Sequence, residues 1–282
     1  MKDNYRQISL SRFCRLLGVT RQAYYQHFWQ EEFIGIEQDL VLQEVRRIRS
    51  RHRHMGGRKL YELVQPYLSE HQIKMGRDAL FDLLQANHLL VRRRKRRIYT
   101  TQSFHWLRKY PNLIKDWSAS QPNQLWVSDI TYWKIASGYV YISLITDAFS
   151  HKIVGYHVAE SLETVETIEA LRMALKNRSA TQHPLTHHSD RGIQYCSHDY
   201  VKLLEENNIK ISMTENSDPR ENAIAERVNG IVKEEYLYDY SVSNLSEAKQ
   251  VLNFAINLYN NERPHMSCDF KTPAAVHQNQ VC

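Results

Sequence analysis

Three acidic residues, Asp129, Asp190 and Glu226, each lie in a local sequence that suits an active site. Carboxylates brought together from distant segments repel one another unless a cation lies between them. Mg²⁺ is a hard cation that prefers oxygen ligands, so it would satisfy such a group. We therefore predict that these acids are the catalytic residues and metal ligands of a phosphoryl-transfer site. We expect two Mg²⁺ ions there, with Mn²⁺ as a substitute.

The segment that contains Asp129 has the composition of a β-strand. Residues 124–135, QLWVSDITYWKI, are rich in β-branched and aromatic types, and residues 139–147 and 151–159 continue a three-stranded meander. A carboxylate in the middle of the first strand is costly to bury without a partner. A metal ion would be such a partner.

Asp190 follows a short predicted strand, residues 185–188, in the sequence Ser-Asp-Arg-Gly. Helices are predicted before this strand, over residues 163–177, and after it, at about residues 197–208. An acid at the carboxyl end of a strand, beside a glycine that permits a close turn, has the usual position for ligand chemistry in a mixed α/β sheet.

Glu226 belongs to a predicted helix with two different faces. The apolar stripe contains Ile224, Val228 and Ile231. The polar stripe contains, at spacings of four, three and four residues, Asn222, Glu226, Asn229 and Lys233. Glu226 therefore projects from the polar face, and Lys233, about two turns away on the same side, could bind a phosphate. For this helix alone, a solvated polar stripe would also explain the pattern.

Charge is segregated along the chain. Residues 1–120 contain 23 Lys and Arg against 11 Asp and Glu, whereas residues 121–282 contain 14 against 20. A basic first part suits a polyanion such as nucleic acid, and an acidic second part suits a core that binds metal ions. No run of about 18 apolar residues occurs, and a polar stretch follows Met1. We therefore expect no membrane span and no signal peptide, and an intracellular protein.

Residues 9–28 predict a helix-turn-helix. The apolar periodicity stops at a glycine, and Thr20 can then cap a second helix through its hydroxyl. That helix would present Arg21, Gln22 and Tyr25 to a DNA groove. The alternative is a helical hairpin that only packs on the core.

A second helical block extends from Asp39 to about Val91, and its third helix would begin at Arg77, which we also assign to DNA binding. Six consecutive cations follow, which would repel one another in a compact fold and suit a phosphate backbone. These cations are Arg92, Arg93, Arg94, Lys95, Arg96 and Arg97. A solvated linker is the alternative for this run.

The cysteines form no recognisable ligand pattern. They are Cys14, Cys196, Cys268 and Cys282. Their scattered positions, without a CxxC pair, argue against a disulfide framework and a zinc finger, so zinc is not predicted. The adjacent His187 and His188 precede Asp190 and are either neighbours of the site or packing residues.

A strand acid, a strand-end acid and a helix acid, in a β-β-β-α-β-α-β-α succession, have the layout of an RNase H-like nucleotidyl-transferase core. The chain also resembles the DDE transposases of bacterial insertion sequences, specifically the second-reading-frame proteins of the IS-three family, which are related to retroviral integrases. The resemblance spans nearly the whole chain and is carried by WVSDITYW at 126–133, HHSDRGIQY at 187–195, ENAIAERVNGIVKEE at 221–235 and YNNERPH at 259–265. The 35 residues between Asp190 and Glu226 match the family's D,D(35)E pattern.

The resemblance implies that Asp129, Asp190 and Glu226 are the catalytic triad and that Lys233 is the basic position after the glutamate. It implies a transposase that binds the terminal inverted repeats of its element and a target DNA, and that cleaves and transfers DNA strands with Mg²⁺. It further implies a homo-oligomer, an upstream-frame protein as a candidate partner, and a bacterial cytoplasmic, nucleoid-associated location.

These patterns together predict an α/β protein whose RNase H-like mixed-sheet core follows all-α helix-turn-helix DNA-binding units. The predicted domains are a helix-turn-helix at 1–32, a second helical DNA-binding unit at 33–97, a linker at 98–120, the catalytic core at 121–240 and a C-terminal helical extension at 241–282. One alternative is a transposase-derived DNA-binding regulator without catalysis, which predicts the loss of an acid. Another is a ribonuclease H, which would ordinarily carry a fourth acid.

Overall fold

The protein, for which we use a computed structural model, forms two compact units. The described residues are 9–91, 106–115, 117–178, 183–215 and 219–278. The helical unit contains residues 1–50 and 60–90, and the sheet unit contains residues 51–59 and 91–282. Each unit has its own hydrophobic core and is described separately below.

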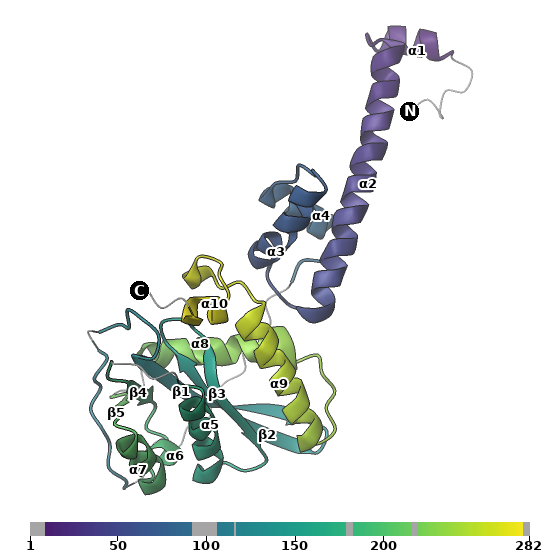
Figure 1. The fold of residues 1–282 in the computed structure, drawn as a ribbon. Coiled ribbons are helices and arrows are strands. Elements are labelled where there is room, and N and C mark those ends of the chain that lie inside the picture. The colour runs from purple at the N-terminus through teal and green to yellow at the C-terminus, as the bar shows by residue number, and fades with distance from the viewer. Residues whose placement is uncertain (1–8, 92–105, 116, 179–182, 216–218, 279–282) are drawn as a thin grey trace. The chain divides into compact units, whose positions relative to one another are not determined.

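The helical unit begins with two helices joined by a tight turn (Figure 1). Helix α1 (Leu10–Leu16) ends before Gly18, whose φ of +67° is a conformation that glycine adopts without steric cost. Helix α2 (Arg21–Arg51) is capped by Thr20, whose Oγ1 accepts a 3.0 Å hydrogen bond from the Ala23 amide. The predicted cap at Thr20 is therefore confirmed.

Helix α2 is longer than the sequence pattern predicted. It continues without a break over 31 residues, so the boundary predicted between residues 32 and 33 falls inside this helix. Its sequence contains Gly35 but no proline, and one glycine costs a helix only about 1 kcal/mol. Although α2 is long, no helix in the described part of the chain is both long enough and apolar enough to span a bilayer.

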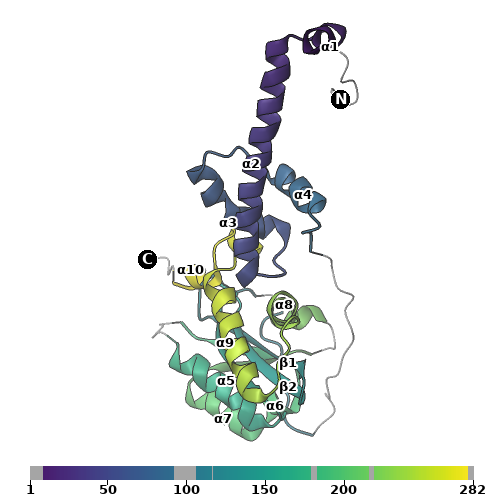
Figure 2. The same cartoon turned by 90° about the vertical axis from the view of Figure 1, so that its right-hand side faces the viewer.

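Helices α3 (Gly57–Glu70) and α4 (Arg77–Ala86) pack against the second half of α2, as Figure 2 shows. Apolar residues at three- and four-residue spacing supply the contact surfaces, in the way the periodicity predicted. The buried core of this unit contains Val41, Leu42, Val45, Ile48, Leu60, Val64, Leu68, Ile73, Leu80, Leu83 and Leu84.

The sheet unit is built on five strands in the order β3-β2-β1-β4-β5. Strands β1, β2 and β3 form an antiparallel meander, and β4 and β5 continue the sheet parallel to β1. The bounds are β1 (Leu125–Ile135), β2 (Gly138–Asp147), β3 (Ile153–Ala159), β4 (Thr186–Ser189) and β5 (Lys210–Met213). The predicted mixed sheet is therefore confirmed, with β1 at its centre.

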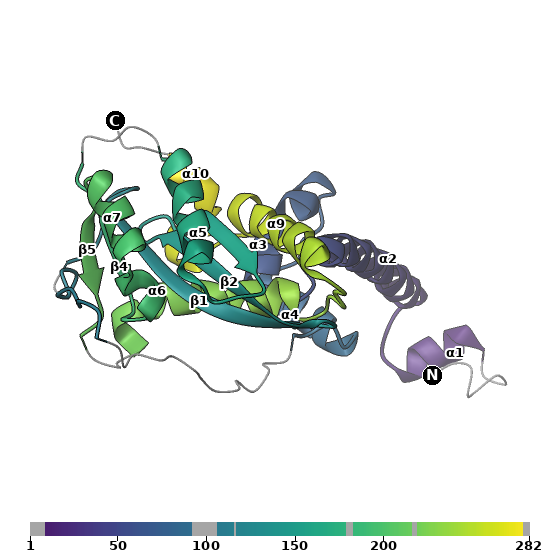
Figure 3. The ribbon, with the colours of Figure 1, turned by 90° about the horizontal axis from the view of Figure 1, so that it is seen from below.

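Helices cover both faces of this sheet (Figures 1 and 3). Helices α5 and α7 pack on the face that buries Trp126 and Ile145. Helices α8 and α9 and the π-helix η3 pack on the face that buries Trp133 and Ile142. The bounds are α5 (Thr164–Lys176), α6 (Ile193–Cys196), α7 (His198–Glu206), the 3₁₀ turn η2 (Pro219–Asn222), α8 (Ala223–Ile231), η3 (Val232–Leu237), α9 (Leu245–Asn261), the 3₁₀ turn η4 (Met266–Cys268) and α10 (Pro273–Gln278).

The predicted linker, residues 98–120, is partly a cover for the sheet edge. Its described residues form no regular helix or strand, yet they pack along β5. The Pro111 carbonyl accepts a 3.2 Å hydrogen bond from the Met213 amide, and the Leu113 amide donates to Ser212 Oγ at 2.8 Å. These contacts occupy polar groups that an edge strand would otherwise expose.

A buried charge cluster connects the segment after α9 to η3. The side chain of Arg263 is 1% exposed, and its guanidinium donates two 2.8 Å hydrogen bonds to the Glu235 carboxylate. Lys59 Nζ donates to the same carboxylate at 2.9 Å. Burial opposes the ionisation of Glu235, but the hydrogen bonds and charges of Arg263 and Lys59 outweigh it and lower the pKa to about 2.

We predict that Glu235→Gln destabilises the folded protein by about 3 kcal/mol at neutral pH, because the buried guanidinium of Arg263 then lacks a counter-charge. The folded-state pKa of Glu235 is about 2, below an unfolded value of about 4.3. The wild-type contribution is therefore present at neutral pH and is lost as the pH falls from about 4 towards 2.

Denaturant unfolding at neutral and acidic pH measures both effects. The matched control is Glu234→Gln on the adjacent, half-buried residue, which should change stability by less than about 0.5 kcal/mol. Equal losses for the two substitutions would contradict the stabilising role of this cluster.

Candidate active site

Strands β1 and β4 bring Asp129 and Asp190 to the same level of the sheet. The two strands run parallel, and Val127 pairs with His188. Asp129 and Asp190 each follow two residues after this pair. Asp129 lies within β1, and Asp190 lies one residue past the end of β4. Neighbouring strands are about 4.8 Å apart, so the register alone makes these two acids neighbours.

The polar stripe predicted on α8 faces β1. Its three contacts with the strand are Asn222 Nδ2 to the Ser128 carbonyl at 3.0 Å, Asn229 Nδ2 to Asp129 Oδ2 at 2.7 Å, and Lys233 Nζ to Thr131 Oγ1 at 3.1 Å. Asn222 and Asn229 are buried. These three members of the stripe therefore contact the protein rather than solvent alone, and they fix the helical segment along the strand that carries the first acid.

The surroundings of the Asp129 carboxyl favour its protonated form. One oxygen accepts a 2.9 Å hydrogen bond from the Ile130 amide, and the other accepts the bond from Asn229. Burial, and then the negative charges of Asp190 and Glu226, raise the pKa of Asp129 to about 7 in spite of these bonds. The two other acids therefore act electrostatically on Asp129, as the predicted site requires.

A glycine turn orients Asp190. The Gly192 amide donates a 3.0 Å hydrogen bond to Asp190 Oδ1. A Cβ at position 192 would lie only 3.0 Å from the same oxygen, so any larger residue would crowd the carboxylate. The Ser-Asp-Arg-Gly sequence thus places the acid at the point where the chain leaves β4 and enters α6.

Glu226 lies in the first turn of α8 with an exposed side chain. Among the described residues, one group of three potential metal ligands has its ligand atoms within 4.8 Å of one another, and it does not contain the three acids. The carboxylate oxygens of Glu226, Asp129 and Asp190 therefore do not all lie within 4.8 Å of one another. Two ions about 4 Å apart, each about 2.1 Å from its ligands, span a longer distance than that. The charge of Glu226 nevertheless acts on Asp129, so a pair of ions could join the three carboxylates.

The donor atoms suit a hard divalent cation. Three carboxylates offer only oxygen ligands, which Mg²⁺ prefers. Oδ1 of Asn229 is buried beside Asp129 and has no hydrogen-bond partner among the described residues. A cation would also relieve the repulsion between carboxylates that contributes to the raised pKa of Asp129. The residues present thus fit bound Mg²⁺.

His187 and His188 pack within the sheet. Both side chains are buried. His187 Nε2 lies 2.7 Å from Ser128 Oγ and 3.0 Å from the Tyr200 hydroxyl, and His188 Nδ1 lies 2.8 Å from Ser212 Oγ. Burial lowers the pKa of His187 to about 3 and that of His188 to about 4, so both are neutral. These contacts favour the packing role of the two alternatives.

Lys233 lies beside the acids on a cationic and aromatic edge. Its ammonium is bonded to Thr131, two residues from Asp129, and lies 4.4 Å from the centroid of the Tyr132 ring. Tyr132 is exposed and contacts Tyr139 edge to face. A cation with exposed aromatic neighbours can contact a nucleic-acid backbone and stack on bases.

Asn229, which donates directly to the first acid, was not among the residues predicted for the site. A signal was available. Asn222 and Asn229 are seven residues apart, two helical turns, on the same face as Glu226. An amide repeated on the face that carries a catalytic acid indicates a polar contact with the opposing strand.

The predicted DNA-binding residues of the helical unit are exposed on two helices. Arg21, Gln22 and Tyr25 lie in the first two turns of α2. Arg77 begins α4, where its guanidinium pairs with the carboxylate of the next residue at 2.8 Å. The cation run at residues 92–97 lies outside the described residues. DNA contact by all of these residues stays a prediction.

Comparison with protein families and curated proteins finds integrase-core models and insertion-sequence proteins similar to this chain. Two models described as "Integrase core domain" match residues 119–219 and 207–273. The "Insertion element IS600 uncharacterized 31 kDa protein" of Shigella sonnei is 34% identical over 94% of this chain and 97% of its own length. "Transposase InsF for insertion sequence IS3A" of Escherichia coli (strain K12) is 32% identical over 60% of this chain and 59% of its own.

A solved structure shares the fold. A chain in the cryo-EM structure of the simian T-cell lymphotropic virus intasome in complex with PP2A regulatory subunit B56 gamma has a TM-score of 0.51 and 20% identity. The match covers 80% of this chain and 76% of that chain. At this identity the likeness extends to the fold alone, and it agrees with the mixed sheet and its covering helices.

For the metal-free protein we predict that Asp129 titrates near neutrality and that Asn229→Ala raises its pKa further, because Asn229 donates to the carboxylate form. Carboxyl carbon NMR of protein labelled at aspartate measures the shift. The matched control is Asn222→Ala, which removes a bond to a backbone carbonyl and should leave the pKa unchanged. An Asp129 carboxyl that titrates near 4 in the metal-free wild type would contradict this account.

The raised pKa of Asp129 makes the stability of the metal-free protein depend on pH. The pKa of Asp129 is higher in the folded state, about 7, than its usual value of 3.8. The folded state therefore binds the proton more tightly, and the metal-free protein loses stability as the pH rises from about 4 to about 7. Asp129→Asn should remove this part of the pH dependence in the same unfolding measurements.

Proposed function

This chain belongs to the IS-three family of DDE transposases of bacterial insertion sequences, and from that premise we propose that Asp129, Asp190 and Glu226 are its catalytic residues. The protein is a transposase, a polynucleotidyl transferase that acts on DNA by DDE chemistry. The observation that supports the residue assignment best is the meeting of the β1 acid with the acid after β4, next to the helix that carries Glu226. Nothing in the comparisons favours a catalytically silent regulator.

We propose that the three carboxylates hold two Mg²⁺ ions, for which Mn²⁺ can substitute. The oxygen-only donor set and the raised pKa of Asp129 support this assignment. When bound, such a pair of ions activates the attacking oxygen and stabilises the leaving oxygen of an in-line displacement at phosphorus.

The chain's own side chains would position these ligands. Asn229 holds one oxygen of Asp129 in place, and the Gly192 amide holds one oxygen of Asp190. Asn222 fixes the backbone of β1 next to Asp129. Lys233 would contact a phosphate of the bound DNA. Burial lowers the pKa of Lys233, and the charge of Asp129 offsets part of that effect.

Two displacements by this one site would account for transposition. In the first, the oxygen of a water molecule bonds to phosphorus, and the bond to the 3′ oxygen breaks, which leaves a 3′-hydroxyl at the end of the element. In the second, that hydroxyl bonds to a phosphorus of the target DNA, and the target's own 3′ oxygen leaves. Each step exchanges one phosphorus–oxygen bond for another, so no oxidant and no covalent protein intermediate is needed.

Recognition of the element ends would come from the helical unit. DNA binding and oligomerisation follow from membership of the family, because transposition joins two element ends to a target. We propose that the terminal inverted repeats are contacted by Arg21, Gln22, Tyr25, Arg77 and the cations at 92–97. We also propose that the protein associates with an upstream-frame protein and with the nucleoid.

The test uses the purified chain, Mg²⁺ and labelled duplex DNA that carries the ends of the element. We predict that Asp129→Asn, Asp190→Asn and Glu226→Gln each lower cleavage and strand transfer by more than about 100-fold, because each removes a charged metal ligand. Mobility-shift assays should show DNA binding within about twofold of wild type, since phosphate and base contacts lie elsewhere.

Two substitutions of the same chemical type serve as controls. Asp199→Asn and Glu205→Gln change exposed acids on α7 and should leave cleavage unchanged. If the three site variants cleave at the wild-type rate, the residue assignment is rejected. If a variant loses both binding and folded structure, circular dichroism separates that outcome from a catalytic defect, and the assignment then rests on the site variants that stay folded.

A further inference from the structure

The sheet unit contains a second group of ligand atoms that the transposition chemistry does not use. Side-chain nitrogens of His151 and His265 and the sulfur of Cys268 all lie within 4.8 Å of one another, and they form the one such set of three among the described residues. We call it the His-Cys cluster. His151 lies between β2 and β3, and the other two residues lie after α9. Cluster and acids are therefore on different segments.

The cluster is sheltered and holds an unused nitrogen. Cys268 is 8% exposed and His265 is 9% exposed. Nε2 of His265 is buried and has no hydrogen-bond partner in the described part of the chain. A buried polar nitrogen without a partner costs free energy, and a metal ion is one way to satisfy it.

Ser267 can hold both imidazoles in the tautomers that a metal needs. Its Oγ lies 2.8 Å from His265 Nδ1 and 3.0 Å from His151 Nε2. A hydroxyl oxygen has two lone pairs, so it can accept an N–H from each ring. The lone pairs then remain on Nε2 of His265 and Nδ1 of His151. A hydrogen bond to the second ring nitrogen is the usual support of a metal-binding histidine.

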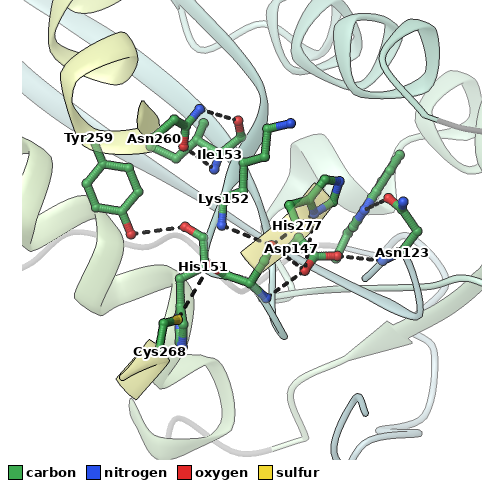
Figure 4. Close-up of polar contacts among 11 residues, drawn as sticks. Asn123, Asp147, His151, Lys152, Ile153, Tyr259, Asn260, Cys268 and His277 are labelled. Atoms are coloured by element: carbon green, nitrogen blue, oxygen red, sulfur yellow. Dashed lines mark hydrogen bonds and ion pairs between the residues drawn. The ribbon is translucent and has the colours of Figure 1, made fainter. Parts of the chain in front are cut away.

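The backbone around the cluster is fixed before any ion arrives (Figure 4). The Tyr259 hydroxyl on α9 donates a 3.0 Å hydrogen bond to the His151 carbonyl. Asn260, also on α9, makes two 2.9 Å bonds with the backbone of Ile153. The Cys268 thiol lies 3.7 Å from the Ser150 carbonyl, and Figure 4 shows it beside His151. Both ligand-bearing segments are therefore tied to α9 and to each other.

We propose that the His-Cys cluster binds one Zn²⁺ ion through His151, His265 and Cys268, with water as the fourth ligand. Two imidazoles and a thiolate select zinc or a chemically similar ion, whereas Mg²⁺ prefers the oxygen ligands of the acids. Binding would link the β2–β3 turn to the chain after α9. This site is independent of the assignment of the catalytic acids.

Binding requires local changes in the cluster. Tetrahedral zinc, with ligand bonds of about 2.0–2.3 Å, places its ligand atoms about 3.5 Å apart, so the cluster must contract. The two rings are stacked with centroids 4.5 Å apart and planes 7° from parallel. At least one ring must turn about its Cβ–Cγ bond to aim its lone pair at the ion. Binding also releases the thiol proton of Cys268 to solvent as the thiolate forms.

The experiment uses the full chain, stripped of metal with a chelator and kept in excess Mg²⁺ so that the oxygen site is occupied. Co²⁺ is titrated in as a spectroscopic replacement for Zn²⁺. We expect one equivalent to produce a thiolate-to-cobalt charge-transfer absorption, and one equivalent of Zn²⁺ to abolish it. Cys268→Ser and His151→Gln should each lose the band or weaken Co²⁺ binding at least tenfold. The control Cys196→Ser, at a buried thiol that contacts Met213, should retain it.

A second measurement needs no substitution. Alkylation of the native chain, mapped by mass spectrometry, should modify Cys268 at least tenfold more slowly with one equivalent of Zn²⁺ than without it, while Cys14 reacts equally in both. Absence of the charge-transfer band from the wild type overturns the proposal. So does a band that Cys268→Ser retains, or an alkylation rate of Cys268 that does not respond to Zn²⁺.

Discussion

A carboxyl group on the central strand is the constraint on which the sheet unit depends. Asp129 lies on β1, between β2 and β4 and beneath α8, where water is scarce and two other acids act on it. Left bare, such a carboxylate would hold a proton and could not bind a metal ion at low cost. Its neighbours are therefore arranged to keep it in one orientation while a cation compensates the charge.

A series of contacts that starts in the segment after α9 supports this orientation of Asp129. Arg263, in the segment after α9, is paired with Glu235 on η3, which continues directly from α8. Helix α8 in turn presents Asn229 to Asp129. The YNNERPH motif thus has a physical role at a distance from the acids: its arginine anchors the helix that carries both Glu226 and the amide that orients Asp129.

The site has no means of reading DNA sequence, because metal-bound carboxylates act on any phosphodiester. Selectivity must come from contacts outside it, and the distribution of charge along the chain is consistent with that division of labour. The helical unit and the cation run contribute the excess of Lys and Arg in residues 1–120, whereas residues 121–282 carry an excess of acids. Cations bound in the sheet unit would offset part of that negative charge.

Strand and helix positions in the sheet unit could be predicted because local composition and fold agree there. The elements that carry the acids could be predicted for the same reason. A run of β-branched residues assigns Asp129 to a strand, and helical periodicity assigns Glu226 to a helix. The full length of α2 could not be predicted. Caps and prolines mark where helices begin and end, and no local sequence signal marks a helix that simply continues past residue 32. The bond from Asn229 to Asp129 and the His-Cys cluster could not be predicted either, because they join residues about 100 positions apart and exist only after the chain has folded.

The most direct test of the central claim is anomalous X-ray scattering from crystals of the wild-type protein equilibrated with Mn²⁺. We expect strong manganese peaks within coordination distance, about 2.2 Å, of carboxylate oxygens of Asp129, Asp190 and Glu226, and two such peaks when a DNA end is bound. Maps of the DNA complex with no peak among these oxygens, or with manganese held by other residues alone, would contradict it.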